Sequence, residues 1–314
     1  MQTHRYAALP RKGSPLRLGR KIWKHRAFYL LLLPAVAYVI LFCYTPMYGL
    51  QIAFKDYKGA LGIAGSRWVG LKHFRSFFSS YNFLQLLRNT LALSLYSLAA
   101  GFPLPILLAL LLNETKSRFK RFSQTVLYAP HFISMVVMVG MLNTLFSPSM
   151  GVINTLREAL GMERYYYMAQ PSAFRHLYVW SGVWQNIGWD AVIYLAALSA
   201  VDPSLHEAAM IDGASRIQRI THINLPTILP TIVILFIMAV GRVASVGYEK
   251  VYLLQNDLNV DVSEVISTYV YKRGVLNSNY SFSTAVGLFN NVVNIALLLM
   301  ANFISRRLGE TSLF

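Results

Sequence analysis

Residues 202–226 read DPSLHEAAMIDGASRIQRITHINLP and separate two long apolar runs of the chain. The first part can open a helix at Pro203 or Ser204, because proline and serine are both favoured at a helix start. Gly213 then allows the chain to turn, and isoleucines recur after it at helical spacing. The stretch therefore predicts a hairpin of two helices, and the next apolar run begins where it ends.

Six apolar runs flank and extend this hairpin, each long enough to cross a membrane. They cover about residues 28–54, 89–112, 125–146, 177–201, 225–245 and 283–304. Of 314 residues, 55% are hydrophobic and 13% are charged, whereas a soluble domain has about 25% charged residues. The sequence therefore predicts an all-α polytopic membrane protein with six transmembrane helices. A transmembrane domain would fill residues 29–308.

The distribution of positive charge predicts the orientation of these helices. Lys and Arg total 29 against 13 Asp and Glu, which gives a formal net charge of +16. Residues 1–28 carry eight Lys or Arg and no acid, as expected of a basic cytoplasmic elbow segment before a first span. Six spans then place the C-terminal tail, residues 309–314, on the cytoplasmic side as well. The loop 202–226 also faces the cytoplasm.

The hairpin resembles the EAA loop of ABC importer permeases, whose pattern is E-A-A-x-x-D-G-A-x5-F-x-x-I-x-L-P. The matching residues are Glu207, Ala208, Ala209, Asp212, Gly213, Ala214, Ile223, Leu225 and Pro226. Ile220 stands where the pattern has Phe. The stretches 28–57, 68–74 and 264–308 resemble the MalF/MalG-type subfamily of oligo- and polysaccharide permeases. The resemblance implies a type I ABC importer permease fold in a bacterial cytoplasmic (inner) membrane.

The resemblance also implies the partners of such a permease. These are a second homologous permease subunit, two cytoplasmic ATPase subunits, an extracytoplasmic solute-binding protein, a saccharide substrate and membrane lipid. The chain contains no phosphate-binding glycine loop, so we expect a transport subunit that is not an enzyme. ATP and Mg would reside in the partner ATPase, and we expect neither a cofactor, a metal site nor nucleic acid on this chain. The residues that the resemblance assigns to ATPase coupling are Glu207, Ala208, Ala209, Asp212, Gly213 and Ala214.

Polar side chains within the predicted spans are candidates for the substrate pathway, because such groups are costly in lipid and usually face a cavity or a partner. The candidates are Trp184, Asp190, Arg242, Asn290 and Asn294. Sugars bind to aromatic faces together with amide and charged groups, which these residues supply. Two alternatives stay open, namely hydrogen bonding between helices and an ion pair of Asp190 with Arg242. Tyrosines near span ends, such as Tyr178, are expected in the interfacial belt.

The predicted outer loop 55–88 is unusually basic, with six Lys or Arg and a single acid, Asp56. The preference of Lys and Arg for cytoplasmic loops does not explain the charges of this outer loop or of Arg242. Positive charge on the outer side would attract an acidic substrate and raise its local concentration. The resembled subfamily includes importers of uronate-containing oligosaccharides, such as alginate or pectin fragments, which we take as the leading substrate hypothesis. The alternatives are a neutral oligosaccharide, a loop that meets an acidic binding protein or anionic headgroups, and an ion-coupled secondary transporter.

Overall fold

The computed structural model describes residues 24–307 and 312–313 of the chain. The chain divides into two units, Met1–Gln51 and Ile52–Phe314. Most of the predicted elbow segment 1–28 lies outside the described residues, as does most of the tail 309–314.

The first apolar run is helical from Arg26 to Phe54, a length of 29 residues. Its successive parts are α2 (Arg26–Tyr38), the π-helix η1 (Val39–Tyr44), α3 (Thr45–Met47) and the 3₁₀-helix η2 (Tyr48–Phe54). A helix of 20 residues already spans 30 Å, so this run is long enough to cross a bilayer.

The second unit begins with a short antiparallel strand pair, β1 (Lys55–Asp56) and β2 (Arg67–Trp68). The elements between and after the strands are η3 (Gly59–Leu61), α4 (Gly62–Gly65) and α5 (Lys72–Phe78). The remaining helices are α6 (Phe83–Gly101), α7 (Pro103–Asn113), α8 (Ser117–Tyr128), η4 (Ala129–Phe132), α9 (Met135–Leu145), α10 (Val152–Ala159), η5 (Tyr167–Ala169), α11 (Pro171–Ser199), α12 (Pro203–Ile211), α13 (Arg216–Arg219), η6 (Ile220–Asn224), α14 (Leu225–Val240), α15 (Tyr248–Leu254), α16 (Val260–Ser263), α17 (Ile266–Tyr271), η7 (Lys272–Leu276) and α18 (Tyr280–Arg307).

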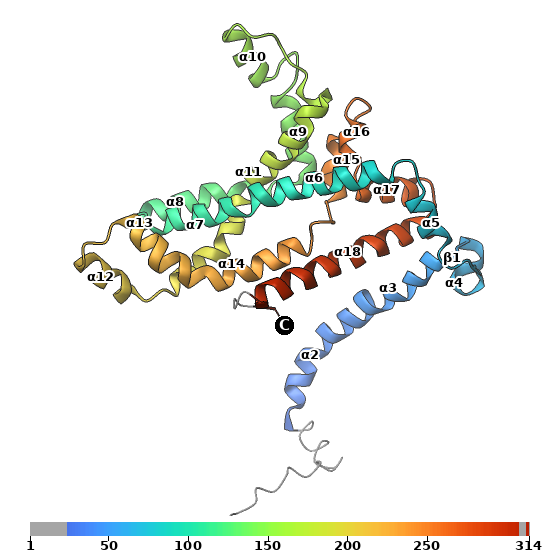
Figure 1. Cartoon of the computed structure of the whole chain (residues 1–314), viewed down its shortest axis with the longest axis horizontal. Coiled ribbons are helices and arrows are strands. Elements are labelled where there is room, and N and C mark those ends of the chain that lie inside the picture. The colour runs from blue at the N-terminus through green and yellow to red at the C-terminus, as the bar shows by residue number, and fades with distance from the viewer. Residues whose placement is uncertain (1–23, 308–311, 314) are drawn as a thin grey trace, which may run out of the picture. The chain divides into compact units, whose positions relative to one another are not determined.

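Helix α11 organises the packing of this unit, since it contacts α6, α7, α8 and α14 (Figure 1). Where α7, α11 and α14 meet, buried apolar side chains form a continuous core; they include Ala109, Leu110, Ala191, Leu195 and Ile228. Gly188 of α11 allows an unusually close contact, because a Cβ there would lie 2.2 Å from the carbonyl oxygen of Leu127 in α8. Helix α18 packs beside α14 and α5.

The predicted count of six spans is only partly matched by the described helices. Four have the length and apolarity of a span: Arg26–Phe54, Phe83–Asn113, Arg216–Val240 and Tyr280–Arg307. A fifth arises if the bent pair Ser117–Phe132 and Met135–Leu145 counts as one. Helix α11 covers residues 177–199 of the predicted span 177–201 and has 29 residues, but polar side chains along it reduce its apolarity.

The predicted span over residues 125–146 is not one continuous helix, because the chain bends by 98° between η4 and α9. Pro130 cannot donate a helical hydrogen bond, and Ser134 restarts the helix as an N-cap that accepts from Val137 N at 3.4 Å. The amide of Gln185 donates to the carbonyl of Ile133 at 2.8 Å. The side chain of Gln185 in α11 thus satisfies a backbone carbonyl at the break, which would otherwise lack a partner in an apolar surrounding.

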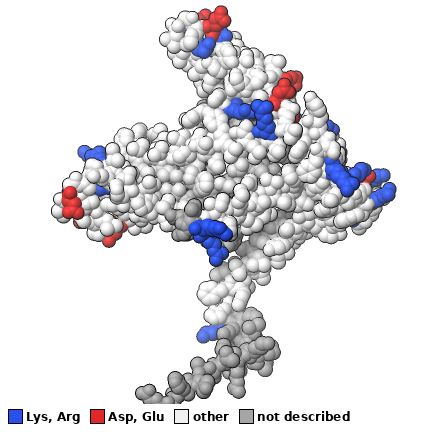
Figure 2. Space-filling view, in the orientation of Figure 1, with Lys and Arg blue, Asp and Glu red and all other residues white. Residues whose placement is uncertain are grey.

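Charged side chains lie mainly at the ends of the helices in this view. The surface between them, drawn in white, consists of uncharged residues (Figure 2). Large apolar side chains remain exposed on the helices, among them Leu95, Leu107, Leu111, Val292, Ile295 and Leu299. A surface this apolar is suited to lipid or to partner helices and not to water.

Candidate functional site

The hairpin predicted over residues 202–226 is present, and its first helix is α12. Asp202 caps that helix, with its carboxylate accepting from the backbone N–H of Ser204 at 2.9 Å. This hydrogen bond, assisted by the Ser204 hydroxyl, lowers the pKa of Asp202. The carboxylate is therefore charged at neutral pH and interacts favourably with the positive end of α12.

Gly213 ends α12 in a left-handed conformation, with φ +79°. The backbone N–H of Gly213 donates to Met210 O at 3.2 Å, and that of Ala214 donates to Ala209 O at 2.8 Å. These two bonds form a Schellman motif, in which glycine is favoured because other residues are strained at positive φ. The shape of the turn thus depends on backbone conformation and not on packing, because a Cβ at Gly213 would have no atom within 4 Å.

The second half of the hairpin continues without a break into the next span. Ser215 and Gln218 form a reciprocal capping box at the start of α13. From Arg216 the chain stays helical to Val240, so the predicted span that begins at Leu225 continues directly from the second helix of the hairpin. One continuous helix, Arg216–Val240, therefore connects the turn at Gly213 with the residues that follow α14; we call it the rod.

The outer surface of the hairpin combines apolar and charged side chains. The large apolar residues exposed on it are Leu205, Met210, Ile211 and Ile217. Glu207 and Asp212 are exposed beside them, and neither side chain has a hydrogen bond or ion pair within the described part of the chain. Exposed apolar residues with charged neighbours are typical of a surface that docks a soluble partner.

A half-buried ion pair ties the hairpin to the end of α7. Arg219 Nη2 lies 3.5 Å from Glu114 Oε2, and the two side chains are 14% and 18% exposed. The buried amide of Asn224 also approaches Glu114, with Nδ2 at 3.5 Å from Oε1. The hairpin is therefore connected to α7 through side chains as well as to α14 through the backbone.

Replacing Arg219 with glutamine is expected to destabilise this junction by about 1–3 kcal/mol, because the half-buried Glu114 would lose its charged partner. The measurement is the melting temperature of the purified complex, together with its substrate-stimulated ATPase rate. Arg216→Gln is the matched control, since Arg216 is exposed on the same helix. Equal stability of the two variants would show that the ion pair of Arg219 with Glu114 does not stabilise this junction.

A cavity of about 470 Å³ lies at the other end of the rod, within the size range of small-molecule sites, roughly 300–1,000 Å³. Its lining includes Asp190, Arg242 and Tyr178. Arg242 follows the end of α14 and is exposed, so its predicted placement within a helical span is wrong. No Asp190–Arg242 ion pair is found between described residues, although both line the cavity. Tyr178, expected in the interfacial belt, lines it too.

Three other predicted pathway residues lie elsewhere. Trp184 lines a separate and largely apolar cavity formed by α9 and α11. Asn294 accepts from Ala244 N at 3.0 Å and donates to Ser245 Oγ at 2.6 Å, while Asn290 Nδ2 lies 3.5 Å from the same hydroxyl. The asparagines thus fasten α18 to the turn after α14, as in the alternative of hydrogen bonding between helices.

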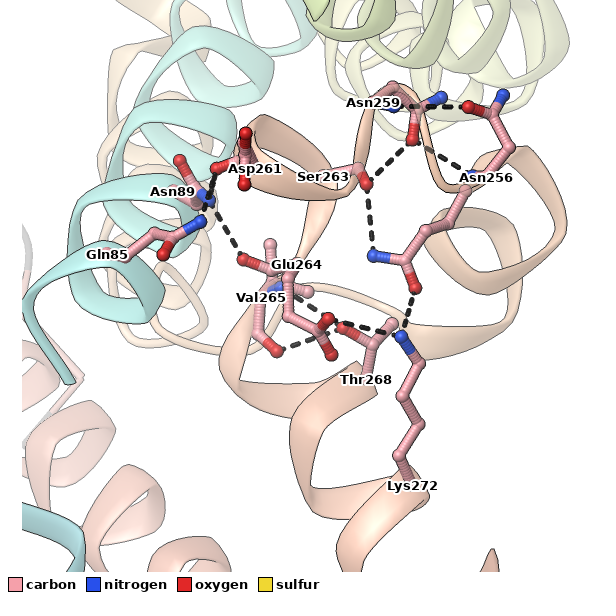
Figure 3. Close-up of polar contacts among 11 residues, drawn as sticks. Gln85, Asn89, Asn256, Asn259, Asp261, Ser263, Glu264, Val265, Thr268 and Lys272 are labelled. Atoms are coloured by element: carbon pink, nitrogen blue, oxygen red, sulfur yellow. Dashed lines mark hydrogen bonds and ion pairs between the residues drawn. The ribbon is translucent and has the colours of Figure 1, made fainter. Parts of the chain in front are cut away.

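A polar network holds the segment after α15 in place (Figure 3). Asn89 of α6 donates to the carbonyls of Asp261 and Glu264 at 2.8 and 3.1 Å. Lys272 donates to Gln255 Oε1 at 2.6 Å and pairs with Glu264 Oε2 at 3.1 Å. Because Gln255 directly follows α15, this network fixes the position of α15 beside α11.

Residues 101–310 match the family model described as "Binding-protein-dependent transport system inner membrane component". That match covers the hairpin, the helix from Arg216 to Val240 and most of the residues that line the cavity. The chain belongs to this family. It is therefore the inner-membrane permease of a binding-protein-dependent ABC importer, a non-catalytic membrane component, and not an ion-coupled secondary transporter.

Two curated relatives of this permease come from Bacillus subtilis (strain 168). The polygalacturonan/rhamnogalacturonan transport system permease protein YteP is 44% identical over 309 residues, which is 98% of this chain and 96% of the relative. Protein LplB is 44% identical over 287 residues, 91% of this chain and 90% of that protein. The full length of the permease is thus shared with both relatives.

Two solved structures have the same fold. A chain of a bacterial alginate ABC transporter, in complex with alginate pentasaccharide-bound periplasmic protein, is 41% identical with a TM-score of 0.86. The match covers 95% of this permease and 100% of that chain. A second structure, of a bacterial ABC transporter that imports the acidic polysaccharide alginate, is 42% identical with a TM-score of 0.85, covering 93% and 99%. The ABC importer permease fold is therefore confirmed.

Proposed function

We propose that this permease imports acidic, uronate-containing oligo- or polysaccharide, such as fragments of pectin or alginate. The observation that carries the proposal is identity above 40%, over nearly the whole chain, to permeases of two transport systems. One is named for polygalacturonan and rhamnogalacturonan, and the other for alginate. Polygalacturonan and alginate are both polymers of uronic acids. The common chemistry is therefore a chain of sugars that bear carboxylates.

The charges of the structure support this substrate class. Lys58, Arg67, Arg75 and Arg88 are exposed in the basic segment 55–88. Lys72 lies 3.9 Å from Asp56, the single acid of that segment. Arg242 adds a cation to the lining of the cavity. Positive charge on the approach and within the cavity would attract a polyanionic substrate.

The proposed assembly contains this permease, a second homologous permease, two cytoplasmic ATPase subunits and an extracytoplasmic binding protein. The alginate transporter was solved with its periplasmic protein bound to an alginate pentasaccharide, which supports the last of these partners. We place six spans across the membrane, with α11 as the fourth and both termini in the cytoplasm. The proposed division into an elbow segment 1–28, a permease domain 29–308 and a tail 309–314 follows from that topology.

The hairpin is proposed to transmit ATPase movement to the cavity. Its coupling residues would be Glu207, Ala208, Ala209, Asp212, Gly213 and Ala214. ATP and Mg would bind to the partner ATPase, whose closure would shift the hairpin. The continuous helix from Arg216 to Val240 then carries that shift to the cavity where Arg242 lies. Such a rigid element allows two positions of the hairpin to correspond to two states of the cavity.

The substrate class is tested by ATPase stimulation of the complete complex in proteoliposomes. The binding protein is supplied with tetragalacturonate or with a neutral tetrasaccharide, and ATP hydrolysis is measured for each. We expect stimulation by the acidic sugar to exceed stimulation by the neutral one. Equal stimulation by both would overturn the acidic-substrate proposal and would leave the family assignment intact.

Replacing Arg242 with glutamine is expected to lower uptake of tetragalacturonate by about tenfold, as loss of one charge-assisted hydrogen bond implies. Asp190→Asn should not lower it, because that change removes a like charge from the cavity. Uptake is measured with labelled sugar in proteoliposomes that contain the whole complex. Arg118→Gln is the matched control, since Arg118 is exposed on α8 away from the cavity lining. Wild-type uptake by the Arg242 variant would remove this residue from the pathway.

A further inference from the structure

Lys250 of α15 is the one lysine or arginine among the described residues that is buried, with 5% of its surface exposed. Its Nζ donates to the backbone carbonyl of Tyr178 at 2.6 Å and lies 4.6 Å from the centre of the Tyr178 ring. A Cβ added at Gly182 would lie 3.0 Å from the same Nζ. The ammonium group is therefore held against one face of α11.

This ammonium group has no carboxylate partner within the described part of the chain, whose ion pairs involve other residues. The Tyr178 carbonyl is the one hydrogen-bond acceptor found for it there, and an ammonium group has three N–H donors. Buried charges are normally paired, since an uncompensated charge is costly to remove from water. The free donors of Lys250 therefore point to an anionic partner that is not part of the described chain.

Lys250 lines a cavity of about 380 Å³ that also includes Gln185, Asn186 and Asp190. This cavity shares Ser97, Gly101, Tyr178, Asp190 and Gly247 with the cavity of Arg242, so the two adjoin. Their combined lining offers cations for carboxylates, amides and carboxylates for hydroxyls, and the Tyr178 ring for a sugar face. Sites that bind small ligands have this mixture of apolar wall and a few placed polar groups.

The position of Lys250 is fixed from both sides of α15. On one side its ammonium is held by Tyr178 of α11. On the other, Asn259 donates to the carbonyl of Leu254 at 3.1 Å, and the network of Figure 3 fastens Gln255. A charged group held by its surroundings loses little conformational freedom on binding, which favours recognition of a ligand.

We infer that Lys250 binds the carboxylate of a uronate unit inside the permease, beside the Tyr178 ring and the adjoining Arg242. The inference rests on the proposed acidic substrate and adds a site to it. Two cations in adjoining cavities could engage successive carboxylates of the same oligosaccharide. A neutral sugar would make no such contacts.

The test compares wild-type and Lys250→Gln complexes, each reconstituted in proteoliposomes with both permeases, the ATPases and the binding protein. The probes are tetragalacturonate and its fully methyl-esterified form, which has the same length without the charges. We expect the substitution to lower uptake of tetragalacturonate by about tenfold and to change uptake of the ester by less than about twofold. Because the binding protein is the same in both complexes, its own preference cancels in this comparison.

Lys250→Arg keeps the charge and should retain most of the tetragalacturonate uptake that Lys250→Gln loses. Lys116→Gln, at an exposed lysine before α8, is the matched control and should resemble wild type. The inference is overturned if Lys250→Gln imports tetragalacturonate normally, or if it loses both probes equally, as a purely structural lysine would. If wild type itself does not favour tetragalacturonate over the ester, the proposed substrate class fails instead.

Discussion

Valine at position 213 is expected to reduce substrate-stimulated ATP hydrolysis by at least about tenfold while the permease still inserts and assembles. Gly213 adopts φ +79° in the turn between α12 and α13. A left-handed conformation costs an ordinary residue about 1–2 kcal/mol, and a β-branched residue is strained most of all. Valine would therefore shift the hairpin away from its docking geometry. The measurement is the ATPase rate of the reconstituted complex with loaded binding protein.

Asparagine at the same position provides the control, because asparagine tolerates positive φ better than other residues. A Cβ at Gly213 has open space around it, so both substitutions fit sterically and differ mainly in backbone preference. We expect Gly213→Asn to retain most of the stimulation. If valine and asparagine behave alike, the conformation of this turn is not what couples the hairpin to the ATPase.

Alanine at position 188 is expected to destabilise the permease and to lower the yield of the assembled complex. Its Cβ would lie 2.2 Å from the carbonyl oxygen and 2.6 Å from the carbonyl carbon of Leu127. Both are backbone atoms, so relief requires α8 and α11 to separate. Overpacking of this kind costs about 1–3 kcal/mol and occasionally more. The measurement is the yield and melting temperature of the complex after purification.

The matched control is Gly140→Ala in α9, where an added Cβ meets no atom within 4 Å. Alanine is favoured over glycine within a helix by about 1 kcal/mol, so this variant should be as stable as wild type or more so. A Gly188→Ala complex that is as abundant and stable as the Gly140→Ala complex would show that the close contact between α8 and α11 is dispensable.

The sequence pattern predicted much of the helical architecture because long apolar runs with few charges have few alternatives in a membrane. The spans near residues 28–54, 89–112 and 283–304 all correspond to described helices of sufficient length. The hairpin could also be predicted, since Gly213 and the residues around it carry recognisable start and stop signals. These predictions depend on local composition, which a single sequence displays directly.

The bend between η4 and α9 could not be predicted from apolarity, because hydropathy records composition and not direction. Pro130 was a visible signal, but proline also occurs within continuous membrane helices. At the break the carbonyl of Ile133 accepts a hydrogen bond from the amide of Gln185, 52 residues away. Such long-range satisfaction of the backbone is not a property of the local pattern.

Only part of the cavity lining could be predicted, because the lining also depends on contacts between residues far apart in the sequence. Asp190 and Arg242 stood out as charges in or near apolar runs, and the structure brings both to one cavity. Lys250 lies between two predicted spans, where a lysine is expected to face water, whereas the structure places its ammonium group against Tyr178. Trp184 shares its helix with Asp190 but lines a different cavity, because six residues along a helix correspond to a large rotation.

ATP-driven uptake by the complete complex tests the central claim most directly. Proteoliposomes with ATP on the ATPase side and binding protein on the other are given labelled tetragalacturonate, with and without an ionophore. The account predicts uptake that requires ATP and binding protein, persists with the ionophore, and exceeds uptake of a neutral tetrasaccharide. Uptake that needs no ATP and collapses with the ionophore, or that is equal for the neutral sugar, would contradict it.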